Sequence, residues 1–257
     1  DKAYVCTVTF TDSAGNTASS LTLTSFTLDT TANTPSETTV VSTPNKDTTP
    51  DVVITTDEAG TIAVTGTNCG LSSTSTMTSG VNTVTLTTSG DAAYSCSIVF
   101  TDALGTAANA LALTAFTIDT AVATPSETTV VSTPNKDTTP DVVITTAEAG
   151  TIAVTGTNCG LSSTSAMTSG VNTVTLTTSG NAAYSCSIVF TDTAGNAASA
   201  LALTAFTIDT AVATPSETTV VSTPNKDTTP DVVITTAEAG TIAVTGTNCG
   251  LSSTSAM

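Results

Sequence analysis

Apolar and polar residues alternate over short runs along most of this chain. From 81 to 88, for example, Val84 and Leu86 point to one side of an extended strand and the intervening threonines to the other. No run keeps helical periodicity over ten residues, and Gly, Pro, Asn and Ser separate the runs, as they do between strands. The pattern predicts an all-β protein.

Seven strands are expected between residues 34 and 123. They cover residues 37–42, 51–56, 61–67, 72–77, 81–88, 93–101 and 108–118. Ile62 and Val64 give the third strand its inward face. In the last strand Leu111 and Leu113 are out of phase with Phe116 and Ile118, which predicts a β-bulge near residues 114 and 115.

Seven short antiparallel strands joined by turns are typical of a two-sheet sandwich of immunoglobulin (Ig) type. In the strand 93–101, Tyr94, Cys96, Ile98 and Phe100 alternate inward. Tyr94 stands two residues before Cys96, the spacing of a tyrosine corner, in which the hydroxyl binds the backbone just upstream. The sequence departs from antibody domains in having no Trp.

The sequence repeats with a period of 90 residues. The stretch "TPSETTVVSTPNKDTTPDVVITT" begins at 34, at 124 and at 214. Four segments are therefore expected in a head-to-tail array: 1–33 as the last two strands of an Ig-like unit, 34–123 and 124–213 as complete units, and 214–257 as the first four strands of another.

The charge of the chain excludes several kinds of partner. Four lysines face 21 acids, His and Arg are absent, and the net charge is −17. Such a polyanion neither neutralises nucleic-acid phosphates nor adsorbs to anionic membrane surfaces, and no membrane-inserting run is expected. Without His or Arg, catalytic triads and phosphoryl clamps are excluded, so we do not expect an enzyme or a required cofactor.

The six cysteines follow the repeat, with two per complete unit. Cys69 and Cys96 are 27 residues apart, as are Cys159 and Cys186. An even pair in a small acidic repeat favours a disulfide and an extracellular, oxidising setting. The alternatives are a reduced buried pair or half of a zinc site, although no CxxC motif is present. The bridge is expected to join two neighbouring strands of one sheet.

Cys6 and Cys249 have no partner at this spacing within the chain. A partner for Cys249 would lie at the position of Cys6 in a following copy of the chain, in register with Cys69 and Cys96. Either this sequence is a window on one long polypeptide, which we favour, or separate subunits complete each other's sandwich in a polymer.

Several blocks resemble a known kind of protein. The sequences "DEAGTIAVTG" (57–66), "TDSAGN" (11–16), "TDTAGN" (191–196) and "FTIDT" are similar to the tandem bacterial Ig-like domains of long surface proteins and adhesin stalks. The resemblance implies a structural role at the cell surface, as part of an extracellular filament or stalk. The alternative is a module that binds carbohydrate or another cell through repeated loops, or through regions outside this chain.

Acidic residues are expected to gather where successive units meet. In an Ig-type sandwich the loops that carry these residues lie at the poles, so head-to-tail stacking brings the end of one unit close to the start of the next. The predicted Ca²⁺ ligands at the two junctions are Asp29, Glu37, Glu58 and Asp102, and then Asp119, Glu127, Glu148 and Asp192. The alternative is that these acids only keep the surface soluble.

The single lysine of the first complete unit, Lys46, lies in a turn flanked by prolines. It is expected to be exposed. An internal Lys–Asn isopeptide bond would need a buried lysine, so none is expected.

Overall fold

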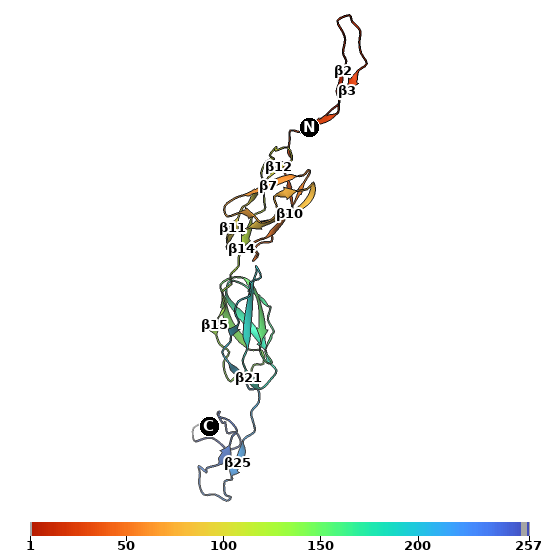
Figure 1. Ribbon diagram of the computed structural model, residues 1–257. Coiled ribbons are helices and arrows are strands. Elements are labelled where there is room, and N and C mark those ends of the chain that lie inside the picture. Colours follow the sequence, from red (N-terminus) through yellow and green to blue (C-terminus); the bar gives the residue numbers. More distant parts are fainter. Residues whose placement is uncertain (1, 253–255, 257) are drawn as a thin grey trace.

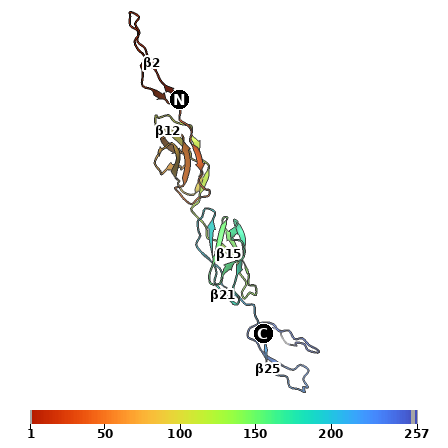
Figure 2. The same cartoon turned by 90° about the vertical axis from the view of Figure 1, so that its right-hand side faces the viewer.

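The computed structural model describes residues 2–252 and 256, which form strands and loops without a helix. Two β-sandwiches follow one another along an elongated chain, and smaller groups of strands lie at its two ends (Figures 1 and 2). Among the described residues there is no helical segment suited to crossing a bilayer.

Each sheet of the first sandwich has four strands. One sheet has the order β5 (Ser36–Thr39), β6 (Asp51–Thr56), β10 (Gly80–Thr87), β8 (Gly70–Leu71). The other has the order β13 (Leu111–Ala112), β12 (Ser97–Asp102), β7 (Gly60–Thr65), β9 (Thr76–Met77), and the pair β11 (Ala92–Tyr94) and β14 (Phe116–Ile118) prolongs β12 and β13. All these pairs are antiparallel, as expected for an Ig-type sandwich.

The second sandwich repeats this topology 90 residues later. Its strands are β15 (Ser126–Thr129), β16 (Asp141–Thr146), β17 (Gly150–Thr155), β18 (Gly160–Leu161), β19 (Ala166–Met167), β20 (Gly170–Thr177), β21 (Ala182–Tyr184), β22 (Ser187–Asp192), β23 (Leu201–Ala202) and β24 (Phe206–Ile208). The all-β fold of tandem Ig-like sandwiches is confirmed.

The core of the first sandwich includes most of the side chains predicted to point inward. Val84 and Leu86 are fully buried, and so are Ile98, Phe100 and Tyr94. Each sandwich has its own core cluster, and the two clusters share no residue. Each sandwich thus buries its apolar residues by itself.

The sixth and seventh strands are both interrupted at the level of Cys96. The sixth divides into β11 and β12, and the seventh into β13 and β14. The Leu113 amide donates to the carbonyl of Cys96 at 2.9 Å, so the chains stay joined across the gap. The phase change predicted near 114 and 115 is real, but it takes the form of a break in both strands and not of a bulge in one.

The first and last strands of the sandwich are joined at three levels. The Glu37 carboxylate accepts from the amide and hydroxyl of Thr114 at 2.9 and 2.8 Å. The Thr43 hydroxyl accepts from the Thr117 amide at 3.0 Å. Asn45 then pairs in parallel with Ile118, its amide donating to the Thr117 carbonyl at 2.9 Å. The chain changes sheets around the cis Thr43–Pro44 peptide, which lies between the first and last of these contacts.

The predicted tyrosine corner is present. The Tyr94 hydroxyl donates to the Gly90 carbonyl at 2.7 Å and accepts from the Ser89 amide at 2.9 Å. These bonds fix the turn that leads into β11, and Tyr184 makes the same pair of bonds in the second sandwich.

Disulfides join Cys69 to Cys96 and Cys159 to Cys186, and they indicate an oxidising environment. As predicted, each bridge links the end of the third strand to its neighbour within one sheet. Gly66 makes room for the bridge. Its φ is +125°, and an added Cβ would lie 2.6 Å from the Ser95 carbonyl oxygen and 3.1 Å from Cys69 Sγ.

The two ends of the chain carry fewer strands. At the N-terminal end, β1 (Lys2–Tyr4) pairs with β4 (Phe26–Leu28), and β2 (Thr7–Val8) pairs with β3 (Leu21–Thr22). Of the four strands expected in 214–257, the described residues show β25 (Ser216–Thr219) paired with β26 (Val233–Thr235). Cys6 and Cys249 form no disulfide with another described residue.

Candidate cation site between successive units

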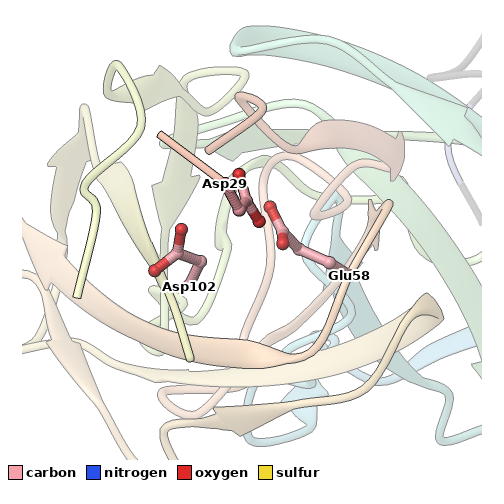
Figure 3. Close-up of side chains that lie close together, drawn as sticks. All are labelled: Asp29, Glu58 and Asp102. Atoms are coloured by element: carbon pink, nitrogen blue, oxygen red, sulfur yellow. The ribbon is translucent and has the colours of Figure 1, made fainter. Parts of the chain in front are cut away.

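Three carboxylates from different parts of the chain meet at the N-terminal pole of the first sandwich. Asp29 follows β4, Glu58 lies in the turn between β6 and β7, and Asp102 ends β12. One oxygen of each lies within 4.8 Å of the others. Figure 3 shows the carboxylates of Asp29 and Glu58 facing each other, with Asp102 beside them.

The same arrangement recurs at the second junction. Asp119 follows β14, Glu148 lies in the β16–β17 turn and Asp192 ends β22. One carboxylate oxygen of each lies within 4.8 Å of the other two. The structure thus brings together three of the four carboxylates expected at each junction. The topology explains this, because the second-to-third and sixth-to-seventh loops share the pole that meets the preceding unit.

Glu37 and Glu127 do not belong to these clusters. Glu37 is bound to Thr114 of its own sandwich, and Glu127 makes the equivalent bonds to the amide and hydroxyl of Thr204 at 2.8 and 2.7 Å. Their placement at the junction was expected because they follow the linker closely. The first strand instead turns them onto the last strand of the same sandwich.

Asp102 is held by the turn that follows it. Its Oδ1 accepts from the amides of Leu104 and Thr106, both at 2.8 Å. Gly105 closes the turn at φ +91°. Burial acts to raise the pKa of Asp102, but the backbone hydrogen bonds of Thr106 and Leu104 outweigh it and the pKa is lowered. Asp102 is therefore ionised at neutral pH.

The second oxygen of Asp102 is unusual. The side chain is 5% exposed, and its Oδ2 is buried without a hydrogen-bond partner. A buried ionised oxygen normally has a hydrogen-bond donor or a cation beside it, since leaving it without either is costly. Of the two clusters, the one with Asp102 therefore contains a buried carboxylate oxygen that a bound cation would stabilise.

The glutamates of both clusters are affected by their acidic neighbours. Burial raises the pKa of Glu58, and the charges of Asp29 and Asp102 raise it further. Burial also raises the pKa of Glu148, with added contributions from Asp119 and Asp192. Like charges held this close repel one another, and a divalent cation between them would reverse the sign of the interaction.

The donor set fits a hard cation. The described side chains of both clusters offer carboxylate oxygen only, without sulfur or imidazole nitrogen, which suits Ca²⁺ better than Zn²⁺. Three carboxylates supply fewer than the six to eight oxygens that Ca²⁺ takes, so backbone carbonyls and water would complete the shell.

The second junction has a contact that the first lacks. Asn196 donates through Nδ2 to Asp192 Oδ2 and to the carbonyl oxygen of Asp119, both at 2.8 Å. Thr106 takes this place in the first sandwich. Sequence reasoning missed the contact, although the difference between "TDALGT" and "TDTAGN" was visible in the repeat.

A hollow of about 550 Å³ lies in the C-terminal segment and is not a second site of this kind. Its lining includes Val232, Ile234 and Ile242. In the complete sandwiches the equivalent residues, such as Val52 and Ile54, are core residues. The hollow is therefore core space and not a place built for a ligand.

No protein-family model and no curated protein sequence match the chain. Solved structures do match. Fibronectin(III)-like modules of CbhA from Clostridium thermocellum align at 11% identity and a TM-score of 0.40, over 68% of this chain and 93% of theirs.

Two further solved structures also align. The D00-D0 domain of Intimin aligns at 11% identity and a TM-score of 0.35, over 66% of this chain and 98% of its own. Domains 4–9 of the surface layer protein SbsC align at 12% identity and a TM-score of 0.25, over 80% of this chain and 35% of that one. The chain is a tandem array of Ig-like sandwiches.

Proposed function

We propose that this chain is a structural segment of an extracellular filament or cell-surface stalk. Its disulfide-bridged Ig-like units add length, and its acidic junctions bind Ca²⁺ to hold successive units in line. The observation that supports this most directly is the repetition of one junction. The same three carboxylates, 90 residues apart, lie each time between the end of one unit and the start of the next.

The arrangement of the units supports the scaffold. The sandwiches follow one another along an extended line in both views (Figures 1 and 2). Each has its own core, so the junction is the part of the array whose geometry is least fixed by packing. A cation bound at the junction would therefore act where stiffness is most needed.

The proposed partners follow from this role. The units associate head to tail with further units of the same kind, at the cell surface or outside the cell. One continuous polypeptide remains the arrangement we favour, and a polymer of separate subunits is its rival. In both, Cys249 is expected to be bridged to Cys6 of the next copy. Denaturing gels with and without reductant separate the two, because only the polymer collapses to single chains on reduction.

The scaffold is tested by the shape of the chain in solution. Small-angle X-ray scattering of the full chain should give an elongated particle, and electron micrographs of native material should show beaded threads. A compact, globular particle would contradict the proposal.

The junction ion is tested by adding Ca²⁺ and then excess chelator. With Ca²⁺ we expect a higher melting temperature and a longer maximum dimension, and chelator should reverse both. Asp29→Asn should abolish the part of the response that comes from the first junction. Asp209→Asn is the matched control, because Asp209 holds the same position after β24 but belongs to no carboxylate group of three among the described residues. Identical curves with Ca²⁺ and with chelator would rule out the ion and leave the scaffold untouched.

A further inference from the structure

The turn after β22 reaches back onto the preceding sandwich through one side chain. Asn196 Nδ2 donates to Asp192 Oδ2 within its own turn and to the Asp119 carbonyl at the end of the unit before it. Both partners are acceptors only, so the nitrogen of the amide must face them. A single side chain thus links two units.

A second side chain reaches across the same junction in the opposite direction. Lys46, in the loop between β5 and β6, donates through Nζ to the Gly195 carbonyl at 2.9 Å. Its side chain lies over Gly195, where an added Cβ would be 3.6 Å from Nζ. The loop of one unit and the turn of the next therefore hold each other.

The other two copies of the turn differ from this one in their contacts. Asn16 makes the same bond within its own turn, from Nδ2 to Asp12 Oδ2 at 3.0 Å, so this bond belongs to the turn itself. Thr106 makes no bond to the preceding unit among the described contacts, and there Asp102 Oδ2 stays without a partner. The linker is instead tied to the sandwich by Asn33, which donates to Asp57 at 3.0 Å.

We propose that Asn196 and Lys46 form a clasp that fixes the orientation of successive units without a bound ion. The residue at the end of this turn then sorts the junctions of the array into two kinds. Junctions with Asn are closed by hydrogen bonds, and junctions with Thr depend on a cation for the same rigidity. The first half of this statement stands without Ca²⁺, whereas the second half rests on the proposed function.

The clasp acts at a junction between two sandwiches whose core clusters share no residue. Interfaces between neighbouring domains of one chain are usually small, so relative motion is the default. Two hydrogen bonds from opposite sides of such a junction restrain both bending and rotation. The like charges of Asp119, Glu148 and Asp192 push the other way, which makes the restraint more important in the absence of an ion.

The clasp can be tested by measuring how widely the two complete sandwiches move relative to each other. Spin labels are attached at Val81→Cys and Val171→Cys, equivalent exposed positions on β10 and β20, in the full chain with Cys6→Ser and Cys249→Ser. Pulsed electron double resonance then gives the distribution of the distance between the labels. The measurements are made in excess chelator, except where the effect of Ca²⁺ itself is tested.

In excess chelator the unmodified second junction should give a narrow distribution of the distance between the labels at positions 81 and 171. Asn196→Thr should broaden it, because it installs the residue that the first sandwich already carries in the same turn. Lys46→Ala should broaden it as well. Asn16→Thr is the matched control and should change nothing, because the bond of Asn16 shown here is to Asp12 of its own turn and does not cross the labelled junction.

The reverse substitution tests the sorting of junctions. Thr106→Asn, with labels at Ser20→Cys and Val81→Cys, should narrow the distribution across the first junction in chelator. Adding Ca²⁺ should narrow the distance distribution across the first junction of the chain that keeps Thr106. No broadening by Asn196→Thr would overturn the clasp, as would equal broadening by Asn16→Thr. If Ca²⁺ changes the distance distribution of no chain, the junction ion is overturned and the clasp is not.

Discussion

Removing one disulfide while leaving its twin intact should separate the unfolding of two nearly identical sandwiches. The change is Cys69→Ala with Cys96→Ala. The bridge spans 27 residues, and closing a loop of that length stabilises the fold by about 3.6 kcal/mol at 25 °C in the chain-entropy model. At roughly 4–8 °C per kcal/mol for a domain of this size, the first sandwich should melt about 15–30 °C below the second.

Differential scanning calorimetry of the full chain is the assay. The unmodified chain should show one transition for both complete sandwiches, because their sequences and cores are nearly the same. The variant should show two, with the upper one unmoved. Cys159→Ala with Cys186→Ala is the mirror control and should lower the other sandwich by a similar amount.

A variant that still melts in a single transition near the original temperature would contradict this prediction. A separation below about 4 °C would correspond to less than about 1 kcal/mol. The disulfide would then lower the conformational entropy of the unfolded chain only slightly.

Three further predictions concern single side chains. Tyr94→Phe removes the bonds to Gly90 and Ser89 and should lower the free energy of unfolding by about 1 kcal/mol, measured by urea denaturation with Tyr184→Phe as its counterpart; an unchanged midpoint would count against the tyrosine corner. Gly66→Ala should cost about 1–3 kcal/mol from its positive φ alone, and more from the contact with Ser95, whereas Gly80→Ala has a positive φ but no neighbour within 4 Å and should cost less. Glu58→Gln should raise the melting temperature in chelator at pH 7 and reduce the response to Ca²⁺. Because the pKa of Glu58 is raised in the folded state, its contribution to stability is present at pH values below the ordinary pKa of 4.5 and is lost as the pH rises through the folded-state pKa. The advantage of Gln should therefore vanish below pH 4.5. An equal gain in melting temperature there and at pH 7 would contradict this.

Features that depend on short range along the chain were predictable from the sequence. The inward phase of Val84 and Leu86 follows from period-two alternation, and the tyrosine corner follows from the two-residue spacing of Tyr94 and Cys96. The disulfide pairing followed from there being two cysteines in each repeat. The grouping of Asp29, Glu58 and Asp102 also followed, because Ig-type topology alone decides which loops share a pole.

Contacts that depend on the course of individual side chains were not predictable. Glu37 was expected at the junction, yet it binds Thr114, 77 residues away, because the first strand pairs against the end of the last one. The clasp of Asn196 was missed for the same reason. Its partner, the carbonyl of Asp119, is a backbone group with no signature in the sequence.

The pairing of the first and last strands decides how a pulling force passes through a unit. Force enters through the linker before β5 and leaves through the linker after β14. Because Asn45 and Ile118 run in parallel, the two segments are pulled in opposite directions along their common axis. The bonds of Glu37 with Thr114, of Thr43 with Thr117 and of Asn45 with Thr117 then resist sliding together. Each bond is weak by itself, but none can open first without the others moving, so a unit under tension holds until all three levels give way at once.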